Sequence, residues 1–225
     1  MENYKKNLEL LTKNFVYTKE MEHDACGVGL IASTEGKKSR AVVEYGIEAL
    51  KAVWHRGAVD ADGKTGDGAG IHVEIPKDFF IEKIQVTGHD YDNSEICVGM
   101  IFLPRNDYSA QESCKTIVES ELTKNNFSIY GWRQVPVNPK VLGEKALQTM
   151  PEIIQVLFKS NDPDLLDKNL ERKIYETRKR IENKAFDASL NNFYICSISS
   201  KSIIYKGLYL AEALSDFYLD IKDPR

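Results

Sequence analysis

Strand-like segments in this chain come in pairs, and helical segments separate the pairs. Apolar residues alternate or cluster over 71–75 and 96–103, and again over 127–137 and 152–158. A doubly wound parallel sheet needs a helix between every two consecutive strands, and this order lacks that regular alternation. We therefore expect an α+β fold with mixed, largely antiparallel sheets and helices packed outside them. No linker rich in proline, glycine or serine divides the chain.

The N-terminal half is expected to begin with a short strand and a helix. Apolar residues over 26–33 predict the strand. Ser39 is placed to cap a helix whose apolar residues recur at helical spacing as far as Trp54, and Gly57 stands where a glycine commonly ends a helix. The sequence His-Arg-Gly at 55–57 is thus predicted at the end of this helix.

Further local signals lie in the second half. The sequence Ser-Ala-Gln-Glu at 109–112 has the spacing of a capping box, in which serine and glutamate bond free N–H groups at the start of a helix. A long charged helix with an apolar stripe is predicted over 166–181. The apolar segments 193–199 and 202–208 lie close enough to predict a β-hairpin, and a short helix at 211–217 follows.

Composition and charge exclude several classes of function. The net charge of −4 leaves no excess of basic residues for a nucleic-acid surface. The longest apolar run, near Ile96 to Pro104, is far shorter than the roughly 20 residues of a membrane-spanning helix. Residues 1–25 lack the apolar centre of a secretory signal. The four cysteines are widely spaced and form no Cys-x-x-Cys pair, which indicates reduced thiols in the cytoplasm.

The glycine-rich stretch 57–70 raises a nucleotide-binding alternative that depends on Lys64. A Walker loop has four residues between its first glycine and the Gly-Lys pair, whereas this stretch has five and also carries three aspartates. A calcium loop would need an acid or amide at Lys64. His23, His55 and His72 lack the spacing that gives metal ligands their specificity. The sequence therefore disfavours a phosphate site and a metal site here.

One of the four cysteines stands apart from the others. Cys97, Cys114 and Cys196 lie in apolar strand or helix patterns, where a free cysteine behaves as a small core residue. Cys26 differs, because the sequence Ala-Cys-Gly-Val-Gly at 25–29 surrounds it with small residues that leave room for a substrate. A tightly packed strand start is the alternative explanation.

A nucleophilic role for Cys26 would explain the segment that precedes it. A thiol reacts as the thiolate and needs a base within hydrogen-bond reach. If the peptide bond before Cys26 is cut, its own α-amino group becomes available, with an ordinary pKa of about 7.7–8.0. Residues 1–25 would then be a removable segment that blocks this amine.

Four stretches carry a resemblance to a known family: "CGVGLIA", "GIEALKAVWHRGAVDADGKTGDGAGIHVEIPKDFF", "YGWRQVP" and "NNFYICSISSKSIIYKGLYL". Together they resemble the class II glutamine amidotransferase region at the start of the large (alpha) subunit of bacterial glutamate synthase. The similarity runs from about Met21 to Arg225. The combination of Cys-Gly-x-Gly with His-Arg-Gly downstream is far more specific than any one of the motifs.

The resemblance implies a fold, a processing step and a reaction. The fold is a four-layer αββα N-terminal-nucleophile hydrolase, truncated here at its C-terminus. Residues 1–25 correspond to a propeptide and residues 26–225 to part of the amidotransferase domain. Cys26 attacks the side-chain amide of glutamine, which gives a γ-glutamyl thioester and ammonia, and water then releases glutamate.

The resemblance also assigns roles to other residues. Arg56 and Gly57 match a segment near the nucleophile and are expected to position it, with simple helix capping as the alternative. The glycines within 67–71 are expected to allow close packing of strands. The family segment "HQRYSTNT" and the Asn-Gly pair of its oxyanion hole follow the last residue, and Arg133 and Asn138 match a different part of the family pattern. We therefore expect this stretch alone to be inactive; a structural or interaction module is the alternative function.

For the complete enzyme the resemblance implies FMN, an iron–sulfur cluster and NADPH, with ferredoxin as the alternative electron source. Ammonia would pass to 2-oxoglutarate, so the enzyme would be an oxidoreductase of glutamate biosynthesis and nitrogen assimilation. The expected partners are L-glutamine, the remaining synthase domains of the large subunit and a small reductase subunit. No cofactor is expected in this chain, because it has no cysteine grouping for a cluster and no barrel-length sequence for FMN.

Overall fold

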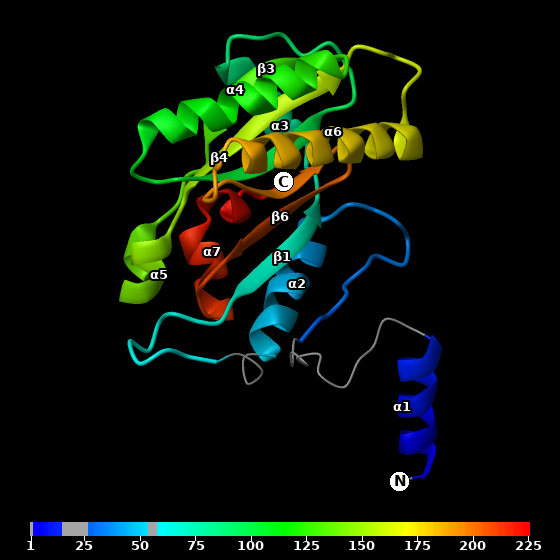
Figure 1. Cartoon of the computed structure of the whole chain (residues 1–225), viewed down its shortest axis with the longest axis vertical. Helices are drawn as coiled ribbons and strands as arrows, with labels where there is room; N and C mark the ends of the chain where they lie inside the picture. Colours follow the sequence, from blue (N-terminus) through cyan, green and yellow to red (C-terminus); the bar gives the residue numbers. More distant parts are fainter. Residues whose placement is uncertain (1, 15–26, 54–57) are drawn as a thin grey trace.

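The computed structural model describes residues 2–14, 27–53 and 58–225 (Figure 1). The described helices are α1 (Glu2–Asn14), α2 (Arg40–Ala52), α3 (Lys77–Val86), α4 (Tyr108–Lys124), α5 (Glu144–Thr149), α6 (Asp167–Asp187) and α7 (Leu214–Phe217). The described strands are β1 (Ala69–Glu74), β2 (Cys97–Leu103), β3 (Phe127–Gln134), β4 (Glu152–Ser160), β5 (Tyr194–Ser199) and β6 (Ser202–Gly207). Short 3-10 helices lie at η2 (Pro139–Val141), η3 (Ala211–Ala213) and η4 (Leu219–Lys222). None of the described helices combines the length and the apolar character needed to cross a membrane.

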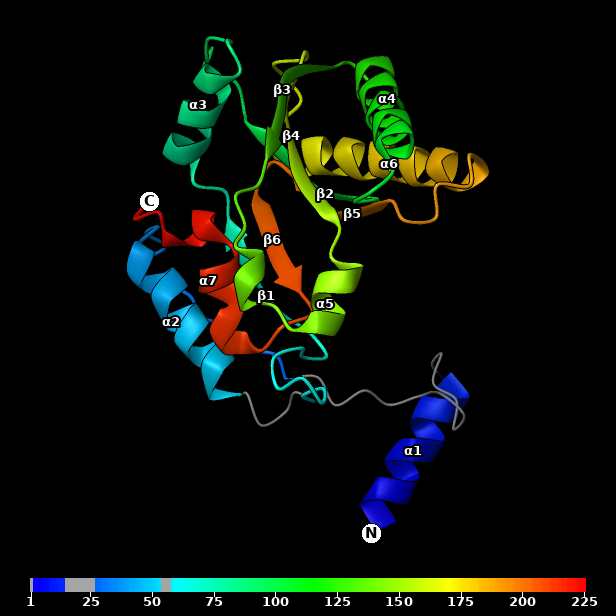
Figure 2. The same cartoon turned by 90° about the vertical axis from the view of Figure 1, so that its left-hand side faces the viewer.

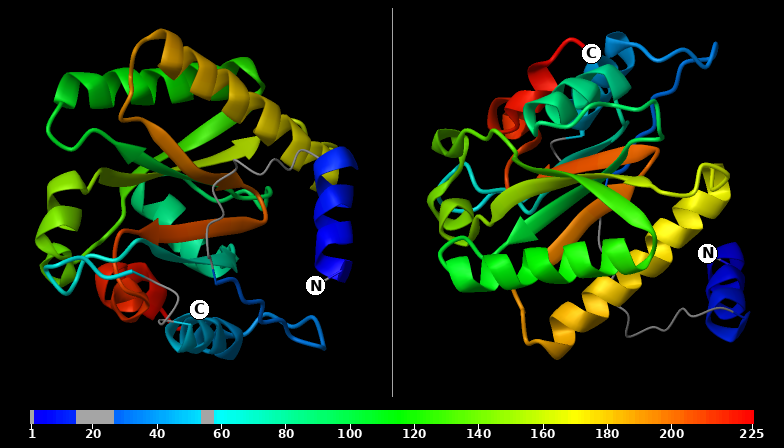
Figure 3. Two further views of the ribbon diagram at one scale, coloured as in Figure 1. Left: turned by 60° about the horizontal axis from the view of Figure 1, so that its bottom comes forward. Right: turned by 90° about the horizontal axis from the view of Figure 1, so that it is seen from above.

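The described strands form two antiparallel sheets. One sheet has four strands in the order β3, β4, β2, β5, and the other pairs β1 with β6. Helices α4 and α6 cover one face of the four-stranded sheet, the β1–β6 sheet packs on the other side, and α2 lies against β1 (Figure 3). The described residues thus stack as helix, sheet, sheet and helix. This arrangement confirms the α+β class and the antiparallel pairing expected from the sequence.

Two apolar clusters fill the spaces between these layers. One lies between the four-stranded sheet and the helices α4 and α6, and it includes Ile101 and Ile174. The other lies between the two sheets and includes Met100 and Ile203. Side chains of β2 and β4 enter the two clusters alternately, which explains why their sequences read as nearly continuous apolar runs. Burying one such side chain stabilises the fold by roughly 1.5–3 kcal/mol.

The three described cysteines are core residues, as the sequence predicts. Cys97 and Cys114 are 0% exposed and Cys196 is 4% exposed. Burial raises the pKa of the Cys114 and Cys196 thiols to about 11 each and raises the pKa of Cys97 still further. These thiols are therefore protonated at neutral pH and unsuited to act as nucleophiles.

The described part of the predicted N-terminal strand, residues 27–33, is not a strand. Val28 is 92% exposed and Leu30 is 88% exposed. A strand needs a neighbouring strand to pair with its N–H and C=O groups. Residues 27–33 belong to neither of the sheets that the described strands form. The prediction was wrong because it used apolar content, which does not supply a pairing partner.

The predicted hairpin is also wrong, because β5 and β6 belong to different sheets. Glu171 of α6 fixes the crossing between the sheets. Its carboxylate accepts hydrogen bonds from Ser199 Oγ at 3.0 Å, Ser200 N at 2.7 Å and Ser200 Oγ at 2.8 Å. Ser199 Oγ in turn accepts one from Lys201 N at 2.9 Å. These bonds satisfy the backbone where the chain leaves one sheet for the other, and a short spacing in sequence cannot reveal them.

Helix α4 begins at a cap other than the predicted capping box. Asp107 is its N-cap, and the Asp107 carboxylate accepts a hydrogen bond from Ala110 N at 2.9 Å. Glu112, the predicted second half of the box, pairs instead with Lys115. Asp107, and not Ser109, therefore occupies the N-cap position of α4. Ser39 does stand at the N-cap of α2, although its side chain makes no capping hydrogen bond.

Candidate active-site groove

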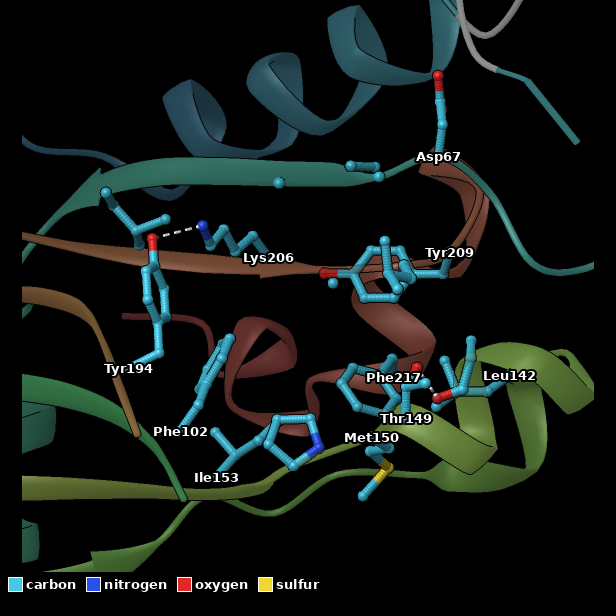
Figure 4. A pocket seen from close by; sticks show the side chains of 18 of the residues that line it. Asp67, Phe102, Leu142, Thr149, Met150, Ile153, Tyr194, Lys206, Tyr209 and Phe217 are labelled. Atoms are coloured by element: carbon cyan, nitrogen blue, oxygen red, sulfur yellow. Dashed lines mark hydrogen bonds between the residues drawn. The ribbon is translucent and has the colours of Figure 1, made fainter. Parts of the chain in front are cut away.

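A groove of about 1830 Å³ lies between the two sheets, at one end of their strands. Figure 4 shows Phe102 and Ile153 of the four-stranded sheet on one side and Lys206 and Tyr209 on the other. Residues around α5, including Met150, also line it (Figure 4). Figure 2 shows α5 beside one end of the strands. We call this space, lined by these residues, the inter-sheet groove. Its walls combine apolar side chains with polar and charged ones, including Asp67 and His72.

The predicted site residues Cys26, Arg56 and Gly57 lie outside the described residues. The same holds for His23 and His55, which the sequence disfavours as metal ligands. The structure therefore assigns these side chains no position, and their roles stay predictions.

Described residues close in sequence to the predicted site residues meet in one place. Gly27, which follows Cys26 directly, lines the inter-sheet groove. Val53 and Val59, which flank residues 54–57, line the same groove. Described residues next to the predicted nucleophile and on both sides of the predicted positioning residues thus border a common cavity.

Residues 58–67 form a tight turn directly after the predicted His-Arg-Gly segment; we call it turn 58–67. Asp60 N donates to Thr65 O at 2.8 Å, and Gly63 N donates to Asp60 O at 2.9 Å. Gly63 has a φ of +68°, a left-handed conformation that glycine adopts without steric cost. A glycine at position 63 therefore suits the left-handed backbone that this turn requires.

The carboxylate of Asp62 organises turn 58–67. Its Oδ1 accepts hydrogen bonds from Lys64 N at 2.9 Å and Thr65 N at 2.7 Å, and its Oδ2 accepts one from Thr65 Oγ1 at 2.6 Å. The Thr65 hydroxyl, followed by these backbone N–H groups, holds the pKa of Asp62 far below its usual range. Thr65 Oγ1 also accepts a hydrogen bond from Ala146 N at the start of α5, at 3.3 Å.

The same bonds argue against the nucleotide-binding alternative. A phosphate loop needs backbone N–H groups that are free to bind phosphate oxygens. Here the N–H groups of Lys64 and Thr65 donate to Asp62, and that of Gly63 donates to Asp60 O. The turn presents carboxylates where a phosphate would need donors.

The groove holds several polar groups, of which the sequence singled out His72 alone, as a disfavoured metal ligand. Lys206 Nζ donates to Tyr194 OH at 2.7 Å, and His72 Nε2 lies 2.6 Å from Ser202 Oγ. Tyr209 is 1% exposed, and its hydroxyl has no hydrogen-bond partner among the described residues. Burial raises the pKa of Tyr209 well above its usual value, so it is a neutral donor. Pairs such as Lys206 and Tyr194 join two sheets, so local sequence patterns carry no signal for them.

Arg133 and Asn138 have structural partners outside the groove. The Arg133 guanidinium contacts both carboxylate oxygens of Asp220, at 2.7 and 2.9 Å, and the side-chain oxygen of Gln155 at 2.7 Å. Asn138 accepts a hydrogen bond from Lys140 N and caps η2. Neither residue is placed to bind a substrate in the inter-sheet groove.

The described residues do not fit a metal cluster. No group of three or more histidine, cysteine, aspartate or glutamate residues among them could hold a metal ion. Cys97, Cys114 and Cys196 are buried in apolar surroundings, where burial opposes the thiolate form that binds iron. We therefore assign no step of chemistry in this chain to an iron–sulfur cluster.

Comparison with known families shows the family to which the chain belongs. A sequence model described as "Glutamine amidotransferases class-II" matches residues 26–225. The chain belongs to the class II glutamine amidotransferases. The match begins at Cys26 and therefore includes all of the residues predicted for the site.

Curated proteins similar to this amidotransferase are glutamate synthases. "Glutamate synthase [NADPH] large chain" of Azospirillum brasilense is 52% identical over 99% of this chain and 15% of that protein. "Ferredoxin-dependent glutamate synthase 1, chloroplastic/mitochondrial" of Arabidopsis thaliana is 40% identical over 90% of the chain and 12% of that protein. "Ferredoxin-dependent glutamate synthase 2" of Synechocystis is 38% identical over 90% of the chain and 13% of that protein. The amidotransferase chain thus spans between 12 and 15% of the length of these relatives.

Proposed function

We propose that this chain is the glutaminase part of a glutamate synthase and that Cys26 is its nucleophile. One observation carries the proposal: Gly27, Val53 and Val59 converge on the inter-sheet groove in a class II amidotransferase. The glutamate synthases among its relatives support the assignment. The groove exceeds the roughly 300–1,000 Å³ of common ligand sites, so glutamine has room to enter.

The proposed reaction transfers the γ-glutamyl group of glutamine to sulfur. The free α-amino group of Cys26 takes the thiol proton, and Sγ forms a bond to the amide carbon of glutamine. The carbon–nitrogen bond then breaks, and the leaving nitrogen takes up that proton and departs as ammonia. Water hydrolyses the thioester, which releases glutamate and restores the thiol. Arg56 and Gly57 are the proposed positioning residues for the new N-terminus.

This mechanism requires removal of residues 1–25, because an amide nitrogen is not basic. We infer that this segment is a propeptide and that residues 26–225 belong to an N-terminal-nucleophile hydrolase domain. The order helix, sheet, sheet and helix in the described residues supports the proposed four-layer αββα fold.

In the complete protein we infer that ammonia reaches a synthase part that adds it to 2-oxoglutarate with FMN, an iron–sulfur cluster and NADPH. The proposed partners are those synthase domains and a small reductase subunit, in the cytoplasm. The higher identity to the NADPH enzyme than to the ferredoxin-dependent enzymes supports NADPH as the electron source. These groups supply the reductive chemistry elsewhere, and the residues of this chain supply ammonia.

The test is intact mass and N-terminal sequencing of the full-length protein, with Cys26→Ala as the control. We expect a mature chain that begins at Cys26 and takes up one equivalent of the glutamine analogue diazo-oxo-norleucine. We expect the Cys26→Ala protein to take up none and to have no glutaminase activity. A chain that retains Met1 with an unlabelled Cys26 would support a structural or interaction module instead.

A further inference from the structure

We propose that Asp62, Gly143 and Lys145 are positioning residues that set how tightly the inter-sheet groove holds glutamine. They hold turn 58–67 against α5, and this turn continues directly into the segment with Arg56 and Gly57. The inference rests on the proposed glutaminase function. None of the three residues is assigned a contact with substrate.

The first step is that turn 58–67 supplies the cap that α5 lacks. The N-cap residue of α5 is Gly143, which has no side chain to bond the free N–H groups of the first turn. Thr65 Oγ1 accepts the hydrogen bond of Ala146 N instead, at 3.3 Å. The hydroxyl of Thr65 is itself held by Asp62 Oδ2 at 2.6 Å. Asp62 thereby fixes the group that joins the turn to the helix.

The second step is a close approach that only glycine permits. A Cβ atom at Gly143 would overlap with Asp62 Oδ2, Thr65 Oγ1 and Thr65 N. The φ of Gly143 is −73°, which any residue can adopt. The need for glycine at this position is therefore steric, because the turn packs directly on the backbone of the helix start.

The third step is an ion pair across the same contact. Lys145 Nζ lies 2.6 Å from Asp60 Oδ2. The Lys145 side chain is 71% exposed, so the pair contributes little to stability by itself. Its charges nonetheless favour one placement of the turn over others, because the pair adds a second link beside the hydrogen bonds of Asp62.

The fourth step connects this contact to the groove. Asp67 N donates to Ala58 O at 3.2 Å, so the two ends of the turn are held together. One end continues into residues 54–57 and the other into β1. Val59 of the turn and Ala146 of α5 both line the inter-sheet groove. A displaced turn would therefore move a wall of the groove together with the attachment point of the predicted Arg56-Gly57 segment.

The experiment measures glutaminase kinetics of the full-length protein. In Asp62→Ala and Gly143→Ala we expect the KM for glutamine to rise about tenfold while kcat changes less than threefold, because binding is weakened and the reacting groups remain. The matched control is Asp162→Ala, since Asp162 accepts a backbone hydrogen bond from Asp164 N in a turn that does not line the groove. We expect its KM to stay within twofold of the wild-type value.

Two rescue variants separate positioning from a general loss of stability. Asp62→Asn keeps an oxygen that accepts backbone hydrogen bonds, so its KM should lie between those of the wild type and Asp62→Ala. Asp60→Lys should raise KM, and adding Lys145→Asp should return it to within twofold by restoring the pair with reversed charges. These rescues remain informative if Asp62→Ala or Gly143→Ala fails to fold.

A wild-type KM in Asp62→Ala and Gly143→Ala, or failure of both rescues, would overturn the positioning role while leaving the proposed function intact. Absence of Cys26-dependent glutaminase activity in the wild-type protein would overturn the proposed function and this inference together. The two failures are therefore distinguishable.

Discussion

At the residue scale, the pair of Arg133 and Asp220 shows how this fold uses buried charge. The two side chains are 13% and 5% exposed, and two hydrogen bonds join them. Gln155, which is 0% exposed, adds a third bond to Arg133. The pair ties β3 to η4 near the end of the chain. Removal of one partner would leave the other charge buried without compensation.

We predict that Asp220→Ala lowers the free energy of unfolding by about 3–5 kcal/mol, because Arg133 loses its counter-charge in a buried place. Urea unfolding followed by circular dichroism would measure the change. Asp216→Ala is the matched control, since Asp216 pairs with Lys222 and both side chains are more than half exposed. Its effect should be about 1 kcal/mol or less. Similar losses in the two variants would contradict the assignment.

At the element scale, the sequence predicted strands that are buried on both faces and helices that are long enough to show a clear apolar period. The apolar runs of β2 and β4 gave those strands, and the stripe that includes Leu170, Ile174 and Ile181 gave α6. Helices α1, α3 and α5 were not predicted. For α3 and α5 the reason is that ten and six residues offer too few turns for a clear period. The hairpin failed because Glu171, from a distant helix, decides how the chain turns after β5.

The N-cap of α4 can be tested directly, because the structure places Asp107 there instead of the predicted Ser109. We predict that Asp107→Ala lowers the free energy of unfolding by about 1 kcal/mol, since Ala110 N loses its acceptor. Ser109→Ala should change it by less than about 0.5 kcal/mol, because its hydroxyl does not cap the helix. Thermal or urea unfolding of both variants would measure this. A larger loss in Ser109→Ala would restore the capping box that the sequence suggests.

At the scale of the whole molecule, several aspartate and glutamate side chains are held in their negatively charged form by neighbouring hydrogen-bond donors. Their pKa values lie below the usual range because lysine, arginine or hydroxyl groups donate hydrogen bonds to them: Asp60, Asp62, Glu82, Asp92, Asp167, Asp216 and Asp223. For Asp223 the Arg225 guanidinium is the largest cause and lowers the pKa to about 2. The folded chain therefore binds fewer protons in acid than the unfolded chain.

We predict that the free energy of unfolding is at its plateau above about pH 5 and falls as the pH drops from 4 to 2. The stabilisation from a lowered carboxyl pKa is complete above the unfolded value of about 3.9 and disappears as the folded groups take up protons. Urea midpoints at pH 6, 4 and 3 would measure the loss. Asp223→Asn should make this decline shallower. A midpoint that rises on acidification would contradict the prediction.

Some features of the candidate site depend on residues close together in the sequence, and others depend on residues that are far apart. The small residues around Cys26 and the glycines of 57–70 can be read from the sequence, since each works over a few positions. The contact between Thr65 and Ala146 joins residues 81 positions apart, so no local pattern contains it. The pairing of Lys206 with Tyr194 depends on two sheets facing each other. Sequence therefore predicts a reacting group, while the contacts between residues distant in the sequence come from the fold alone.

The direct junction between β5 and β6 has a mechanical consequence. The chain crosses between the sheets at Ser200 and Lys201, whereas the inter-sheet groove lies at the opposite end of the same two strands, beside Tyr194 and Gly207. Six residues of β5 extend roughly 20 Å. The junction therefore joins the two sheets at one end of these strands, and the groove lies at the other end. If one sheet rotated by a few degrees about the junction, atoms beside Glu171 would move least. Atoms at the groove, where glutamine is proposed to enter, would move most, because displacement grows with distance from the axis.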